Sequence, residues 1–118
     1  MSEATTITVI RRADLPFRPV QGDGAVGLSL ARLYRSADNA FTFQMAHIEP
    51  GGVSRRHAHA WEQVNLVVSG AGIIETGETQ TLIGPGDCVI LPGNVGHAIS
   101  CTGDEPLVLV AVLGPGAA

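Results

Sequence analysis

Hydrophobic and polar residues alternate along this chain in short runs, and turn-forming residues separate most of the runs. Such alternation is typical of β-strands with one buried face, and no segment shows a sustained helical period. Frequent short strands favour a sandwich or a barrel. We predict an all-β domain with strands at Thr6–Ile10, Val26–Arg35, Ala40–Glu49, Val53–His59, Gln63–Val68, Ala71–Thr76, Gln80–Ile83, Asp87–Leu91, His97–Cys101 and Leu107–Leu113.

The length and composition fit one domain without a membrane segment. The chain has 118 residues, and its fifteen glycines and seven prolines supply the turns. The most apolar run, Leu107–Leu113, is too short to cross a bilayer and is predicted to be a buried strand. The amino terminus lacks the basic start and apolar stretch of a secretory signal, so we expect a cytoplasmic protein.

The charged residues and cysteines narrow the possible chemistry. The net charge is −4 and the seven basic residues are scattered arginines, which argues against nucleic acid as a partner. The absence of lysine excludes Schiff-base catalysis. Cys88 and Cys101 are expected to remain reduced in the cytoplasm and to pack as small core residues.

Two histidines and a glutamine follow a Gly-rich turn. His57 and His59 are two residues apart, so on a strand both imidazoles would project to the same side of the sheet. Gln63 follows four residues later, at the head of the next predicted strand. Its amide oxygen is therefore placed to join the imidazoles.

A third histidine follows a second turn. The segment Gly84–Asp87 is a predicted turn, a buried strand follows it, and Pro92–Gly96 forms another turn before His97. Imidazoles held on rigid strands suit one divalent transition metal, such as zinc, iron, manganese, nickel or copper. We therefore predict a metal site built from His57, His59, Gln63 and His97.

The first segment resembles the first motif of the cupin family. Gly51, His57, His59, Gln63 and Gly70 follow that motif's spacing, with glutamine where glutamate is usual.

The second segment resembles the second cupin motif. Gly86, Pro92 and His97 match, while Asn94 replaces a usual glycine and Cys101 stands at a usual asparagine. The resemblance implies a cupin jelly-roll β-barrel filling residues 1–118, with an amino-terminal strand and arm at 1–20 and the core barrel at 40–113. It also implies a homodimer, in which the strand Thr6–Ile10 adds to the partner's sheet.

The position of Gln63 leaves alternatives open. A neutral amide is a weaker ligand than a carboxylate, so Gln63 either binds the metal directly or forms a hydrogen bond beside it. Glu62 would replace it only if the strand register slipped by one residue.

Four further residues are candidates for binding a small-molecule substrate. Arg55 adjoins His57 and would hold a carboxylate or phosphate if it turned inward, although a solvated turn residue is the ordinary interpretation. Asn65 shares strand parity with Gln63, and Cys101 shares it with His97. His47 shares the parity of its neighbours on Ala40–Glu49, where a structural role or a role in the pocket is possible.

The neutral ligand set suggests what the site does. Three imidazoles and an amide leave a divalent ion its full charge, which attracts chelating anions such as enolates, carboxylates and hydroxy-ketones. The sequence favours an enzyme that uses the metal as a Lewis acid in isomerisation, ring-opening or cyclisation of a sugar acid or enolisable ketone. Cupins that linearise unsaturated uronates and polyketide-cyclase-like cupins are similar in this respect.

Two alternatives remain open at this point. One is an iron- or manganese-dependent dioxygenase, for which the missing carboxylate is a disadvantage, because an anionic ligand stabilises the higher oxidation state. The other is a non-catalytic small-molecule binding or sensing module.

Overall fold

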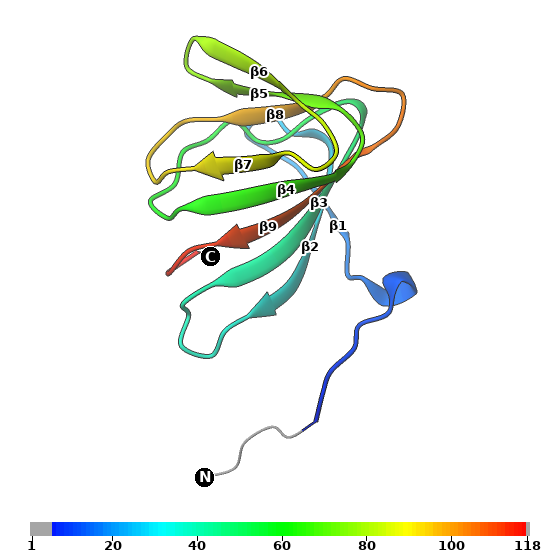
Figure 1. The fold of residues 1–118 in the computed structure, drawn as a ribbon, viewed down its shortest axis with the longest axis vertical. Helices are drawn as coiled ribbons and strands as arrows, with labels where there is room; N and C mark the ends of the chain where they lie inside the picture. The colour runs from blue at the N-terminus through cyan, green and yellow to red at the C-terminus, as the bar shows by residue number, and fades with distance from the viewer. Residues whose placement is uncertain (1–5, 118) are drawn as a thin grey trace.

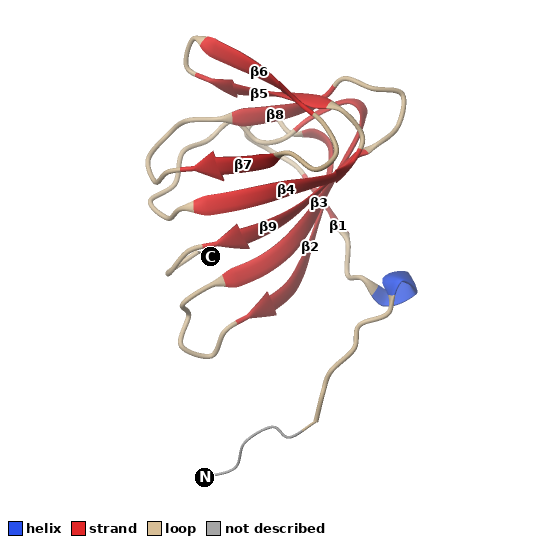
Figure 2. Cartoon of the chain, viewed as in Figure 1, coloured by secondary structure: helices blue, strands red, loops and turns tan. Residues whose placement is uncertain are grey.

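The computed structural model describes residues 6–117, which fold into nine strands and one 3-10 turn (Figures 1 and 2). None of the helical structure in that range is long or apolar enough to cross a membrane. The elements are η1 (Arg12–Asp14), β1 (Arg18–Val20), β2 (Val26–Arg35), β3 (Thr42–Val53), β4 (Gln63–Ser69), β5 (Gly72–Thr76), β6 (Thr79–Ile83), β7 (Cys88–Leu91), β8 (Ala98–Cys101) and β9 (Leu107–Leu113).

The strands form one curled antiparallel sheet, as Figure 1 shows. The order along it is β6-β5-β8-β3-β9-β4-β7, and β1 and β2 extend it beside β3. Strand β3 joins the parts, because it pairs with β2, with β9 and, through Val53, with Ser100 of β8. The all-β jelly-roll prediction is confirmed.

Alternation along the strands sets the core. In β9 the side chains of Leu107, Leu109, Ala111 and Leu113 are buried, while those between them are more exposed. Ile48 on β3 is also fully buried and packs in the same cluster as Leu107 and Leu109. The segment Leu107–Leu113 is therefore the buried strand that its sequence predicted.

The amino-terminal region differs from the prediction. Thr6–Ile10 is not a strand, and Ile7 and Val9 are exposed. The first strand is β1, which pairs with β2 and which the apolar pattern missed because Arg18-Pro19-Val20 does not alternate. Proline is tolerated there because β1 lies at the end of the sheet, next to β2 alone. Residues 1–5 of the expected arm lie outside the described residues.

The Gly-rich turn that was predicted ahead of His57 is instead part of β3. The strand continues through Pro50 and Gly51 to Val53, and the register against β2 shifts there as a β-bulge. Gly51 adopts φ +80°, a backbone conformation that suits glycine. The predicted strand Val53–His59 is wrong, since the chain leaves the sheet after Val53.

Candidate metal centre

Two loops meet at the site and fix its histidines. The backbone N–H of His57 donates to the carbonyl of His97 at 3.2 Å, and the N–H of His97 donates back to His57 at 3.0 Å. The N–H of Asn94 donates to the carbonyl of His59 at 2.6 Å. These bonds satisfy the backbone of a segment outside any named strand. The backbone of His97 and Asn94 therefore holds His57 and His59 in position.

The turn at Gly93 and Asn94 is shaped for this contact. A Cβ atom on Gly93 would collide with the carbonyl oxygen of Ala60, so the close approach requires glycine. Asn94 has φ +66°, a left-handed conformation that asparagine tolerates better than most residues. This explains how asparagine replaces the glycine usual in the resembling motif.

The three imidazoles face one another. Ligand atoms of His57, His59 and His97 all lie within 4.8 Å of one another. The Nδ1 atom of His59 lies 2.9 Å from the carbonyl of Trp61, and that of His97 lies 3.0 Å from the carbonyl of Val95. A carbonyl only accepts hydrogen bonds, so both Nδ1 atoms carry the proton and both Nε2 atoms keep a lone pair for a metal.

The surroundings of His57 and His97 lower the pKa of both imidazoles. The pKa of His57 is lowered to about 4, mainly by burial and also by the neighbouring His97, Arg55 and His59. Burial likewise lowers the pKa of His97, although its hydrogen bond to the Val95 carbonyl opposes the shift. Both imidazoles are therefore neutral at neutral pH, which is the form that binds a metal.

One unpartnered atom fits a metal ion directly. The Nε2 atom of His59 is buried and has no hydrogen-bond partner. A buried lone pair without a partner is costly, and a cation would satisfy it. The three-histidine group is thus able to hold a divalent metal.

Trp61 holds the His59 ring in place. Its indole ring stacks on the His59 imidazole with ring centroids 4.6 Å apart and an interplanar angle of 4°. Its backbone carbonyl holds Nδ1 of the same ring. Trp61 also packs against Ala111, Leu113 and Ala117, so the stack is anchored in the body of the protein.

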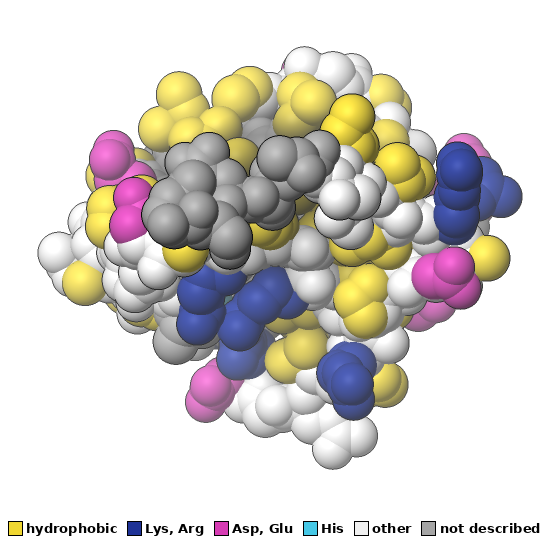
Figure 3. Space-filling view, turned by 90° about the horizontal axis from the view of Figure 1, so that it is seen from below, with side chains coloured by type: hydrophobic (Ala, Val, Ile, Leu, Met, Phe, Trp, Pro, Cys, Tyr) yellow, Lys and Arg dark blue, Asp and Glu magenta, His cyan; other side chains and the backbone are white. Residues whose placement is uncertain are grey.

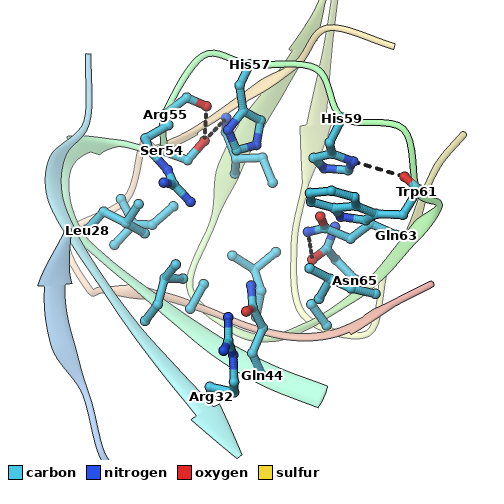
Figure 4. A pocket seen from close by; sticks show the side chains of 17 residues that line it. Leu28, Arg32, Gln44, Ser54, Arg55, His57, His59, Trp61, Gln63 and Asn65 are labelled. Atoms are coloured by element: carbon cyan, nitrogen blue, oxygen red, sulfur yellow. Dashed lines mark hydrogen bonds between the residues drawn. The ribbon is translucent and has the colours of Figure 1, made fainter. Parts of the chain in front are cut away.

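The site opens on a cavity of about 290 Å³, seen in Figure 4. His57 and His59 line it, while His97 is buried and does not. Arg32 and Arg55 are the arginines of its lining, and no acidic side chain in the described part of the chain lines it. The cavity is therefore suited to anions.

Besides His57 and His59, three sequence-predicted residues line this cavity. Gln63 and Asn65 start β4 and point inward together, with Gln63 Nε2 donating to Asn65 Oδ1 at 3.0 Å. In the view of Figure 4 the Trp61 ring lies between His59 and the Gln63 amide. Arg55 lies on another wall, near Ser54. Metal ligation by Gln63 remains a prediction.

Two predicted substrate-binding residues lie elsewhere. His47 is not in the cavity lining, because β3 turns Gln44, Ala46 and Ile48 toward the cavity and His47 to the other face. There it contacts the Phe17 ring and lies 3.7 Å from the Glu49 carboxylate.

Cys101 is the buried core residue that was predicted and does not line the cavity; its thiol donates to the carbonyl of Glu105 at 3.2 Å. Cys88 is exposed, so its predicted place in the core is wrong. Glu62 is exposed, with its carbonyl accepting from Gly114 at 2.8 Å. The register slip that would have brought Glu62 inward is not adopted, since Gln63 pairs with Leu91 and Leu113.

Sequence reasoning missed Trp61, Arg32 and Gln44 as lining residues. Arg32 shares the parity of Leu28 and Leu30 on β2, so strand alternation would have found it. Trp61 lies in the loop between the motif residues, where alternation gives no direction. In Figure 3, basic side chains lie around and below the middle of this face of the molecule and at one edge, and acidic side chains lie toward the edges.

Comparison with solved structures places this architecture among known proteins. A predicted oxalate decarboxylase from Thermotoga maritima superposes with TM-score 0.82 at 21% identity, covering 92% of this chain and 99% of that one. The polyketide cyclase RemF from Streptomyces resistomycificus gives 0.79 at 17% identity, covering 96% and 87%. KdgF from Halomonas sp. gives 0.78 at 16% identity, covering 93% and 96%.

The sequence itself supports the same assignment. No curated protein matches the sequence of this chain. The family model for the cupin domain matches residues 44–113, a stretch that contains β4 to β9, most of β3 and all three facing histidines. The chain therefore belongs to the cupin domain family.

Proposed function

We propose that this protein is a metal-dependent enzyme that isomerises, ring-opens or cyclises a small oxygenated anion, such as a sugar acid or an enolisable ketone. The observation that carries the proposal is the facing group of His57, His59 and His97 beside a cavity whose lining has arginines and no acid. The names of the structural neighbours cover several chemistries, so the fold alone does not choose among them.

The lining residues define how such a reaction would be supported. A bound divalent metal would polarise a carbonyl or hydroxyl oxygen and so acidify the adjacent C–H or O–H. Arg55 would bind the substrate carboxylate, because its guanidinium forms no ion pair among residues 6–117, whereas the neighbouring Arg56 pairs with Glu75 at 3.2 Å. The apolar side chains Ile99, Leu109 and Leu113 exclude water from the rest of the cavity.

Proton transfer has few protein groups available. The lining includes no carboxylate, thiol or phenol from the described residues. The Ser54 hydroxyl already accepts from the Ile99 N–H at 2.8 Å. The proton would therefore pass to water or to a second basic atom of the substrate, which favours Lewis-acid chemistry over catalysis by a protein carboxylate.

The same scarcity favours a second candidate, a binding or sensing module that needs no general base. An iron- or manganese-dependent dioxygenase is the third candidate, and oxygen uptake by the iron-loaded protein separates it from the other two.

The test begins with the metal. Metal-free protein is titrated with Zn²⁺, Ni²⁺ and anaerobic Fe²⁺ by calorimetry and by the fluorescence of Trp61, the chain's one tryptophan. His59→Ala is expected to lower the affinity more than about 100-fold, since it removes a direct ligand. His47→Ala is the matched control and should bind as the wild type does.

The reaction is then tested by deuterium exchange. The metal-loaded protein is incubated in D₂O with 2-oxo and hydroxy acids, and NMR follows deuterium incorporation at the carbon beside the carbonyl. Exchange that needs metal and His59 supports the enzyme. Metal binding without exchange or turnover would favour the binding module, and equal exchange by His59→Ala would contradict the proposal.

A further inference from the structure

Unpartnered polar atoms are concentrated around the cavity. Within residues 6–117, buried side-chain atoms without a hydrogen-bond partner occur on Thr42, Arg55, His59, Trp61 and Asn65. All of these residues except Thr42 line the cavity. Native proteins satisfy nearly all buried polar groups, so a cluster of exceptions in one cavity indicates a ligand that completes it.

The chemistry of these atoms specifies what the ligand must provide. His59 Nε2 offers a lone pair and is assigned to the metal. The other three are N–H groups: Arg55 Nε, Trp61 Nε1 and Asn65 Nδ2. Indole and guanidinium nitrogens only donate. The cavity therefore requires acceptor atoms from its ligand at more than one place.

The donors lie on two different walls. Figure 4 shows Arg55 beside Ser54 on one side, and Trp61 and Asn65 with the β4 residues on the other. Asn65 is 2% exposed, and its Oδ1 already accepts from Gln63. Its NH₂ group is thus the part that remains free.

The buried polar atom of Asn65 on the β4 wall of the cavity lacks a partner whichever way the two amides are assigned. If both were reversed, Asn65 would donate to the Gln63 oxygen, and the buried Asn65 oxygen would lack a partner in place of the NH₂ group. A ligand hydroxyl satisfies either atom, because it accepts from an NH₂ group and donates to an oxygen.

We propose that Trp61 and Asn65 form a second recognition site, separate from the metal ligands, for a hydroxyl or carbonyl oxygen of a substrate whose carboxylate lies at Arg55. The substrate class is then a polyoxygenated carboxylic acid rather than a hydrocarbon or simple aromatic acid. This assignment rests on the proposed function for the site's use, but its hydrogen bonds can be measured without turnover.

A matched pair of ligands isolates these bonds. Galacturonate and cyclohexanecarboxylate share a six-membered ring and one carboxylate, and differ in their ring oxygens. Calorimetry measures both on metal-free and zinc-loaded protein. The wild type should bind galacturonate roughly tenfold more tightly than cyclohexanecarboxylate, as expected for one or two hydrogen bonds.

Variants test whether Trp61 and Asn65 cause the preference for galacturonate. Asn65→Leu keeps a branched side chain of similar size and should remove most of the preference by weakening galacturonate alone. Trp61→Phe keeps an aromatic ring on His59 and should reduce the preference in the same way. Arg55→Gln should weaken both ligands alike, because both carry the carboxylate. Gln80→Leu, an exposed amide on β6, and Arg56→Gln are the controls.

The outcomes separate the two proposals. Three results would overturn the second site. The first is a wild type that binds the two ligands equally. The second is an affinity ratio that is unchanged in both Asn65→Leu and Trp61→Phe, and the third is an equal loss of affinity for both ligands in Asn65→Leu. If the wild type does not bind zinc, the proposed function is overturned but the second site is not. The affinities for galacturonate and cyclohexanecarboxylate are also compared on metal-free protein. Unchanged zinc affinity in Asn65→Leu, together with a lost preference, supports the second site.

Discussion

The two faces of β4 reverse the usual arrangement of a surface strand. Toward the cavity the strand presents Gln63 and Asn65, and Asn65 is 2% exposed. Toward the outside it presents Val64, Leu66 and Val68, which are 40%, 47% and 49% exposed. An antiparallel sheet with one wet face normally carries polar residues there. The polar residues inside fit the proposed ligand, and for the apolar residues outside we propose a protein partner.

The apolar positions continue across neighbouring strands. Val64 pairs with Ile90 of β7 and with Val112 of β9, which are 67% and 43% exposed. We call Val64, Leu66, Val68, Ile90 and Val112 the outer face. It has no charge, so two copies can meet there without repulsion, and we expect a second copy of the chain to cover it. This would place the predicted homodimer on a sheet face rather than on the strand Thr6–Ile10.

The largest effect is expected from breaking the outer face. Leu66→Glu places a charge in the middle of the proposed interface on both copies, where like charges cost several kcal/mol. The dimer dissociation constant should rise roughly 100-fold or more, as measured by light scattering and analytical ultracentrifugation. Leu82→Glu alters a leucine on β6 that is 77% exposed and should leave assembly unchanged. A wild-type monomer would refute this account of the outer face.

A smaller effect is expected on the inner face. Gln63→Glu introduces the carboxylate that the cupin motif usually has, and it should tighten metal binding at least about tenfold through charge attraction. Asn65 can still donate to the new carboxylate. Calorimetric titration with Zn²⁺ measures the change, and Gln80→Glu on β6 is the control for added charge. Weaker binding in Gln63→Glu would show that residue 63 does not act at the metal.

The smallest effect concerns pH. The pKa of His57 is about 4 in the folded protein and about 6.5 in the unfolded chain, so between these values the unfolded state binds more protons. The metal-free protein should therefore lose stability as pH falls from about 6.5 to about 4, and the lowered pKa of His97 adds to the loss.

Thermal unfolding across that pH range measures the loss. His57→Gln should flatten part of the slope, since glutamine does not titrate. An identical slope in this variant would mean that other groups cause the acid sensitivity.

The fold and the three histidines could be predicted from the sequence, but the local structure expected at His57 and His59 was wrong. Motif spacing identified His57, His59 and His97, and the structure brings their ligand atoms together. The expected route was a shared strand, whereas His57 and His59 lie in a loop held by backbone bonds to the second motif. Pairing between distant segments is not encoded in local alternation.

Strand alternation shows which residues share a face, but it does not show which face points into the cavity. It correctly grouped Asn65 with Gln63 in the cavity. It placed His47 on one face of the strand Ala40–Glu49 equally well, but that face of β3 points away from the cavity. Which of two faces is inside depends on the closed sheet, and the position of a loop residue such as Trp61 depends on its packing.

The backbone bridge between His57 and His97 joins positions forty residues apart in the chain. Contacts of such long separation form only when the sheet has closed, because the entropy of the intervening loop opposes them earlier. The three imidazoles then gather as a consequence of closure, not before it. During refolding, metal capture should therefore coincide with the final cooperative step, and metal in the medium should slow unfolding more than it speeds folding.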